Sequence, residues 1–299
     1  MEQSTYDPCL LFTTGDETAI IGLQTDDTLL LTDEKFAEKE EKELRKAGFA
    51  TKEREKLTPE NPIKFNGGSI TIRGDSLTLT QKQHCRNIGV VSSEPADMTS
   101  SRGMTKKGVS PEKQYIAQRA RGAYTATICQ PETAFDLSSA AQVTEPTKDN
   151  VSKLNKRLTG QKENLSRGLT FVPLDNKGPL RLVVFTDSSF ANNRDYSSQI
   201  GYIIVLADER DNANIIHWSS TKCKRVTHST LASELYGMAN GFDISTAIKA
   251  TIEKIVKTDL PLTLCTDSKS LYDCLMKLGT MHKKQLMIDI MCLRQSYER

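Results

Sequence analysis

The stretch Leu182-Val-Val-Phe-Thr-Asp-Ser-Ser189 is nearly repeated later in the chain as Leu262-Thr-Leu-Cys-Thr-Asp-Ser-Lys269. Each copy is a short apolar run that ends in Thr-Asp-Ser, and such runs are typical of buried strands. If the two strands are parallel neighbours, Asp187 and Asp267 leave the sheet at the same end, which is where ligands bind in open α/β sheets. The repeat therefore predicts an α/β sheet with two carboxylates at one edge.

The segments around these two strands predict the rest of the sheet. Three apolar or alternating runs, 180–185, 200–206 and 215–218, are separated by polar turns and predict a three-stranded meander. Residues 228–250 repeat apolar side chains at helical spacing, and residues 268–278 predict a second helix. The order of three strands, helix, strand and helix indicates a mixed sheet packed on helices.

A third carboxylate, Glu234, lies on the edge of the apolar face of the predicted helix, three residues after Leu231 and four before Met238. A carboxylate there must be paired, hydrogen-bonded or bound to a cation, because bare burial is costly. Taken alone, Asp267 before a helix is more often a turn or N-cap residue. Only the combination of Asp187, Glu234 and Asp267 is specific.

Such a combination is what metal-dependent phosphodiester cleavage requires. Converging carboxylates without a nearby histidine or cysteine favour Mg²⁺ or Mn²⁺. Two such ions, about 4 Å apart, can activate a water molecule and stabilise the leaving oxygen of a phosphate. The sequence therefore predicts a catalytic site with two Mg²⁺ (or Mn²⁺) ions at these three residues.

The front half of the chain predicts hairpins followed by helices. Residues 9–24 read as a hairpin about the Gly15-Asp16 turn, and the adjacent carboxylates Asp26 and Asp27 precede the next apolar run, 29–31. By themselves these two aspartates are more often a turn than a site. The remaining expectations are a hairpin at 63–80, an exposed loop at 92–108, and helices at 33–47, 111–128, 132–143 and 148–161.

Composition sets only broad limits. The chain has 40 Lys and Arg against 38 Asp and Glu, and this balance neither demands nor excludes a nucleic-acid partner. Seven cysteines without a Cys-x-x-Cys pair argue against a disulfide framework and a zinc site, and favour an intracellular compartment, cytoplasmic or nuclear. No apolar run is long enough to span a membrane, and residues 1–20 do not resemble a signal peptide.

Five motifs between residues 185 and 270 together resemble the ribonuclease H domain of copia-type retrotransposons. In order they are Phe-Thr-Asp187-Ser-Ser-Phe-Ala, Ser-Gln-Ile-Gly201-Tyr202, His-Trp218-Ser-Ser-Thr-Lys222, Ser229-Thr-Leu-Ala-Ser-Glu234-Leu-Tyr236 and Thr-Asp267-Ser-Lys-Ser. The resemblance implies that Asp187, Glu234 and Asp267 bind the catalytic metals and that the substrate is an RNA–DNA hybrid. One position departs from the family, because Leu231 stands where its helix motif has a first acidic residue.

The front half resembles the reverse transcriptase of the same polyproteins. Ile21-Gly-Leu-Gln24-Thr-Asp-Asp27 is similar to the Tyr-x-Asp-Asp hairpin, with Gln24 in the aromatic position as in fungal copia-like elements, which implies that Asp26 and Asp27 are catalytic. Residues 114–142 resemble the segment that links polymerase to ribonuclease H. The implied regions are a partial reverse transcriptase palm at 1–90, a thumb- or connection-like helical segment with a linker at 91–170, and a C-terminally truncated ribonuclease H-like domain at 171–299.

The same resemblance implies that catalytic parts lie outside this sequence. The polymerase family needs a third carboxylate and most of a palm before Asp26, so we expect no DNA polymerase activity from this chain alone. Its ribonuclease H has a fourth catalytic aspartate after a helix resembling residues 281–290, so we expect cleavage of hybrids to be weak or nil. Asp289 matches a helical position and is interpreted as structural.

Substrate contacts and rival interpretations stay open at this point. Lys222, Lys224 and Arg225 precede the catalytic helix and could bind phosphates in a salt-dependent manner, or could form a solvated loop. Trp218 fits a core position better than a base-stacking platform. The chain could instead be a non-catalytic, decayed or domesticated nucleic-acid-binding remnant. An integrase-like core is disfavoured because its glutamate comes last, and no feature assigns an oligomeric state.

Overall fold

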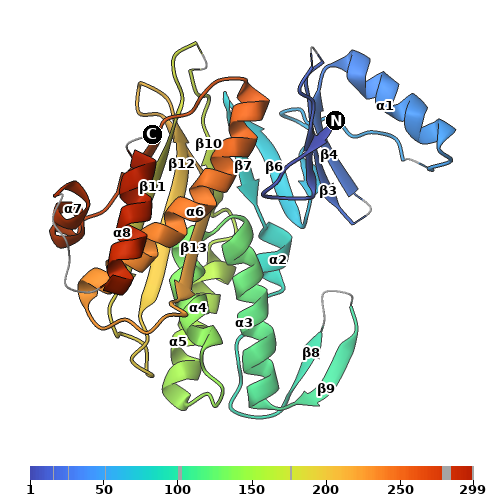
Figure 1. Ribbon diagram of the computed structural model, residues 1–299. Coiled ribbons are helices and arrows are strands. Elements are labelled where there is room, and N and C mark those ends of the chain that lie inside the picture. Colours follow the sequence, from blue (N-terminus) through green and yellow to red (C-terminus); the bar gives the residue numbers. More distant parts are fainter. Residues whose placement is uncertain are drawn as a thin grey trace.

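The computed structural model describes residues 1–15, 17–25, 27–50, 52–99, 103–175, 177–277 and 284–297. Figure 1 shows an N-terminal sheet with helix α1 on one side of the molecule, a helical layer in the middle, and a C-terminal sheet with long helices on the other side. The described part of the chain is a mixed α/β structure, as the sequence predicts.

The N-terminal sheet contains β1 (Glu2–Gln3), β2 (Leu10–Phe12), β3 (Ala19–Gln24) and β4 (Asp27–Thr32), all antiparallel and in chain order. The predicted hairpin at 9–24 is confirmed, although Asp16 of its turn lies outside the described residues. Helix α1 (Glu34–Lys46) is confirmed as well; the Asp33 carboxylate accepts a hydrogen bond from the Phe36 amide at 2.8 Å.

A second sheet joins segments that are far apart in the chain. Its order is β10 (Gly168–Phe171), β7 (Ser76–Thr80), β6 (Gly68–Arg73) and β5 (Ile63–Phe65), which confirms the hairpin predicted at 63–80. Strand β10 was not predicted, because four residues are too few to show an alternating pattern. At Gly168, a Cβ atom would lie only 2.1 Å from the carbonyl oxygen of Leu79, so this pairing requires glycine.

The prediction of an exposed loop at 92–108 is wrong about the secondary structure. Strands β8 (Ala96–Thr99) and β9 (Thr105–Val109) form an antiparallel hairpin, of which residues 100–102 lie outside the described part. Its side chains are largely exposed, so neither face buries the alternating apolar residues by which a strand is recognised in a sequence. The guanidinium of Arg121 connects to the hairpin by donating to the carbonyl of Thr99 at the turn end of β8, and it also donates to the carbonyl of Asn87.

The helical layer confirms three predicted helices. It consists of the short α2 (Lys82–Arg86), α3 (Pro111–Ile128), a 3-10 turn at Pro131–Thr133, α4 (Ala134–Ala141) and α5 (Lys148–Glu163). Ser110 precedes α3 as predicted, but its side chain makes no capping hydrogen bond, whereas Thr147 and Asn150 form a capping box at α5. Buried side chains between these helices form one core, which includes Tyr115, Leu137, Leu154 and Leu158.

The C-terminal sheet has the order β13 (Ala213–Lys222), β12 (Gln199–Ala207), β11 (Arg181–Ser189) and β14 (Leu262–Cys265). The first three strands are antiparallel neighbours, which confirms the meander. Strand β14 pairs in parallel with β11, and the last partners in this register are Phe185 and Cys265. Asp187 and Asp267 each follow two residues after that pair, so the strand pairing predicted from the repeat is confirmed.

Three helices complete this part of the chain. Helix α6 (Thr230–Val256) crosses the sheet, and α7 (Lys269–Met276) and α8 (Lys284–Tyr297) pack against α6 (Figure 1). The hydroxyls of Ser229 and Ser268 accept hydrogen bonds at the N-termini of α6 and α7. The helices predicted at 228–250 and 268–278 are thus confirmed; residues 278–283 lie outside the described part.

Direct contacts connect the front half to the C-terminal sheet. The indole of Trp218 on β13 donates to the carbonyl of Ala126 on α3 at 2.9 Å. The hydroxyls of Ser4 and Thr251 form a buried hydrogen bond of 2.8 Å. The three regions 1–90, 91–170 and 171–299 remain a prediction; the Trp218 contact joins the second region to the third, and the Ser4 contact joins the first to the third. Among the described residues, no helix is both long and apolar enough to cross a membrane.

Candidate metal centre

The ends of β11 and β14 place the first two carboxylates of the site. Beyond the last strand pair, the hydroxyl of Thr186 donates to the carbonyl of Cys265 at 3.2 Å and holds the two strand ends together. The Asp187 carboxylate accepts a hydrogen bond from the amide of Ser188 at 2.7 Å, which fixes its orientation. Asp187 and Asp267 are both exposed to solvent.

Glu234 comes from the N-terminal part of α6 and is buried, with 6% of its surface exposed. Its Oε2 atom has no hydrogen-bond partner. An unpartnered carboxylate oxygen inside a protein is unfavourable unless a cation or a proton offsets its charge. The burial of Glu234 therefore fits the expectation that its carboxylate binds a cation.

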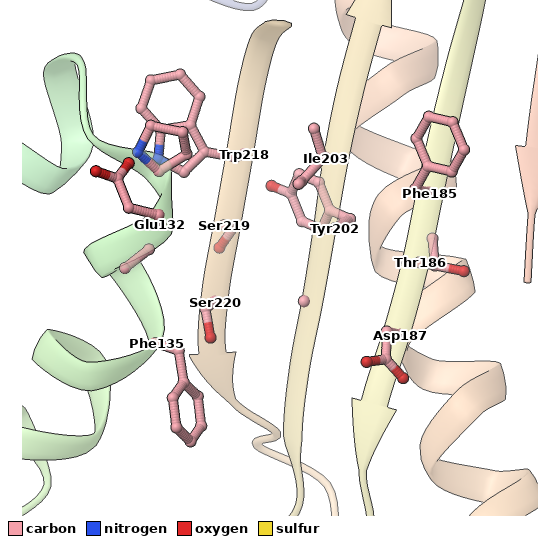
Figure 2. Close-up of a pocket in the computed structure, with 13 residues that line it drawn as sticks. Glu132, Phe135, Phe185, Thr186, Asp187, Tyr202, Ile203, Trp218, Ser219 and Ser220 are labelled. Atoms are coloured by element: carbon pink, nitrogen blue, oxygen red, sulfur yellow. The ribbon is translucent and has the colours of Figure 1, made fainter. Parts of the chain in front are cut away.

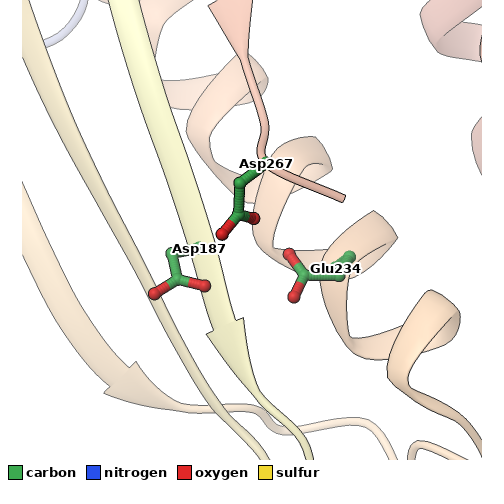
Figure 3. A group of neighbouring side chains, drawn as sticks. All are labelled: Asp187, Glu234 and Asp267. Atoms are coloured by element: carbon green, nitrogen blue, oxygen red, sulfur yellow. The ribbon is translucent and has the colours of Figure 1, made fainter. Parts of the chain in front are cut away.

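The three carboxylates point toward one another (Figure 3). One oxygen atom from each of Asp187, Glu234 and Asp267 can be chosen so that all three lie within 4.8 Å of one another. The cluster is open to solvent on the side of the two aspartates and closed on the side of the glutamate. Oxygen donors in this arrangement suit a hard divalent cation such as Mg²⁺ or Mn²⁺.

Burial and nearby charges at the cluster shift the pKa of Glu234. Burial raises the pKa of its carboxyl group, and the negative charges of Asp187 and Asp267 raise that pKa further. Like charges at this distance disfavour simultaneous ionisation. A bound cation would reverse this balance, because its positive charge stabilises the ionised form.

Comparison with known proteins adds a second line of observation. No protein-family model matches the chain. Over 90 residues, or 30% of its length, the chain is 32% identical to the Gag-Pol polyproteins of the transposons Ty1-JR2 and Ty1-MR1 of Saccharomyces cerevisiae. The similarity is to copia-type retrotransposon Pol polyproteins. The aligned part spans 5% of the length of these relatives.

The solved structures that resemble the chain include the foamy viral protease-reverse transcriptase in complex with an RNA/DNA hybrid, with a TM-score of 0.48 and 14% sequence identity. The match covers 91% of this chain and 34% of the viral one.

Of the Asp-Asp pair expected from the retrotransposon polymerase motif, the structure describes Asp27. Asp27 is exposed and begins β4, where it pairs with Gln24 across the turn. Asp26 lies outside the described residues. Asp27 does not belong to the acidic cluster, and Figure 1 shows the β3–β4 hairpin on the opposite side of the molecule from α7 and α8.

Of the three basic residues predicted to contact nucleic acid, two form ion pairs within the chain. Lys222 pairs with Asp195 and lowers the pKa of that carboxyl group. Arg225 pairs with Asp289 at 3.1 Å, and its guanidinium lies 4.9 Å from the centre of the Tyr236 ring. Within the described residues Lys224 is exposed and makes no ion pair. The contact between Asp289 and Arg225 agrees with a structural role for Asp289.

A cavity of about 280 Å³ lies beside the cluster, between the sheet and α4. Figure 2 shows Phe185 and Asp187 of β11, Ile203 of β12, Trp218 of β13 and Phe135 of α4 around it. The cavity has no signal in the sequence, because strand register brings its lining residues together. Trp218 was predicted as a core residue; it is half-buried, and its ring lines the cavity while its N–H group contacts α3.

Proposed function

We propose that Asp187, Glu234 and Asp267 bind two Mg²⁺ or Mn²⁺ ions, and that the C-terminal region acts as a ribonuclease H on the RNA strand of RNA–DNA hybrids. The observation that carries this proposal is the convergence of three carboxylates within 4.8 Å around a buried, unpartnered Glu234 oxygen. The similarity to Ty1 Gag-Pol polyproteins supports the assignment to a retrotransposon enzyme.

The exposed and the buried carboxylates would have different roles in the site. Ions bound there would activate a water molecule and offset negative charge on the leaving oxygen of the phosphate. Asp187 and Asp267, on the open side, leave room for a phosphate group to approach. Glu234, held by α6, supplies a ligand whose position does not depend on solvent. The ordered backbone at both strand ends keeps the donors preorganised.

The front half belongs to the same proposal. We propose that residues 1–90 correspond to part of a reverse transcriptase palm and that Asp26 and Asp27 correspond to its catalytic pair. Residues 91–170 would be the thumb- or connection-like segment, and residues 171–299 the ribonuclease H-like domain. The β3–β4 hairpin with Asp27 at its turn supports this correspondence.

A hybrid-cleavage assay tests the proposed function. With the purified chain in molar excess over a labelled RNA–DNA hybrid, we expect slow cleavage of the RNA strand in the presence of Mn²⁺ or Mg²⁺. The rate is expected to be low because the described residues bring together three carboxylates with at most three negative charges for two divalent ions.

The controls of this assay are a chelator, a DNA duplex of the same sequence, and Asp267→Asn, each of which should remove the cleavage. Cleavage that survives in Asp267→Asn would come from another source and would contradict the assignment of the site. Cation binding without any cleavage would favour the non-catalytic nucleic-acid-binding alternative.

Lys224 provides a test of the nucleic-acid contact. We expect Lys224→Ala to weaken hybrid binding and to reduce the slope of log affinity against log salt by about one, the value for one lost phosphate contact. Fluorescence anisotropy at several salt concentrations measures both. The matched control is Lys64→Ala, because Lys64 is also exposed but lies on β5 in the front half. Equal slopes for the two variants would place the contact elsewhere.

A further inference from the structure

The face of α6 that packs on the sheet carries two glycines in line with Glu234. Gly237 and Gly241 lie three and seven residues after it, which places all three on the same side of the helix. All three are buried. Because seven residues span about 10 Å along a helix, Gly241 lies two turns from the acidic cluster.

Gly241 marks a close contact between α6 and the sheet. A Cβ atom at this position would lie 2.9 Å from Cγ2 of Thr186, 3.2 Å from Cγ1 of Val184 and 3.3 Å from Cβ of Tyr202. These atoms come from β11 and β12, not from the flexible ends of long side chains. The Thr186 methyl group cannot rotate away easily, because the Thr186 hydroxyl donates to the carbonyl of Cys265.

We propose that Gly241 is a positioning residue for the metal centre: its lack of a side chain lets α6 lie close enough to β11 for Glu234 to reach Asp187 and Asp267. This inference rests on the proposed function, since it concerns the geometry in which the three carboxylates hold a cation. A side chain at residue 241 pushes the helix away from Thr186, and the same rigid helix then carries Glu234 away from the cluster.

Gly237 provides a matched contrast within the same helix. A Cβ atom there would lie 3.4 Å from the carbonyl oxygen of Asp187 and 3.8 Å from two atoms of Ile200, which are ordinary contact distances. Alanine at either position gains the same helix propensity over glycine. The two substitutions therefore differ in steric fit, although Gly237 is the one nearer to Glu234.

The experiment measures Mn²⁺ affinity by calorimetry and the thermal midpoint of the metal-free protein for the full chain. We expect Gly241→Ala to bind Mn²⁺ about 10-fold more weakly, the lower end of the effect seen when residues that orient metal ligands are changed. The Mn²⁺ affinity of Gly237→Ala should stay within about twofold of that of the unmodified chain, since the added Cβ atom makes no contact shorter than an ordinary van der Waals contact. Adding Thr186→Ser to Gly241→Ala removes the nearest methyl group and should restore most of the affinity.

The possible outcomes separate this inference from the proposed function. If the unmodified chain does not bind Mn²⁺, the proposed function fails. If it binds and Gly241→Ala folds and binds equally well, the positioning role is overturned and the metal site stands. If Gly241→Ala does not fold and Thr186→Ser fails to rescue it, the contact with Thr186 is not the one that sets the helix position, which also overturns the inference.

Discussion

Asp187→Asn is expected to weaken Mn²⁺ binding by more than about 100-fold, since changes to residues that merely orient metal ligands already cost about 10- to 100-fold. The substitution removes one of three negative charges and leaves a neutral amide with a single oxygen donor. Because Asp187 is exposed at the end of β11, the fold should survive the change. Isothermal calorimetry with Mn²⁺ or Mg²⁺ measures the loss directly.

Asp273→Asn is the matched control for this measurement. Asp273 lies on α7 and pairs with Lys277 at 3.5 Å, and it is not part of the acidic cluster. The same chemical change there should leave Mn²⁺ affinity within about twofold, because Asp273 contributes no oxygen atom to the cluster and its charge is already paired with Lys277. Similar losses in both variants would mean that the ion binds to the acidic surface in general, and the site would then be wrongly assigned.

Glu234→Gln is expected to have two opposite effects. Without a cation, the substitution removes a buried charge with an unpartnered oxygen, so the free energy of unfolding at pH 7 should rise by about 1 kcal/mol or more. With a cation, it removes a ligand, so binding should be lost. Urea unfolding with and without saturating Mg²⁺ measures both, and the order of stability of the two proteins should reverse.

The pH dependence of this difference follows from the raised pKa of Glu234. Below the ordinary carboxyl value of 4.5, Glu234 is protonated in the folded and unfolded states alike. As pH rises from there through the raised folded-state pKa, the folded state holds more protons, so the metal-free chain loses stability. The advantage of Glu234→Gln should therefore grow over this window and then level off. If metal-free Glu234→Gln were less stable than the unmodified chain at pH 7, the proposed cost of burying the ionised Glu234 carboxylate would be contradicted.

The acidic site could be predicted from the sequence because each of its three residues lies in a segment with a clear local pattern. Two similar strand ends and one helix face carry Asp187, Asp267 and Glu234, and strand and helix periodicity are the strongest signals in a sequence. The parallel pairing of β11 with β14 then placed the two aspartates together, as expected. Whether these residues bind metal and cut RNA stays a prediction.

Other features left no local signal in the sequence, either because they are exposed or because they depend on contacts between distant segments. The exposed β8–β9 hairpin has no apolar alternation, and the ion pair of Arg225 with Asp289 joins residues on different elements. The steric role of Gly241 is invisible in the sequence, where a glycine within a helical pattern only lowers the expectation of a helix. Its neighbours Thr186, Val184 and Tyr202 are known only from the packing.

The pairing of β10 with β7 has a consequence for how this polypeptide can be dissected. Gly168 lies opposite Thr80, so the second sheet receives its fourth strand only after the intervening helices have been synthesised. A recombinant piece that stops at residue 90 would leave β7 as an exposed edge strand, and such strands tend to pair with other chains and aggregate. Pieces meant for separate expression should therefore keep residues 63 to 171 on one polypeptide.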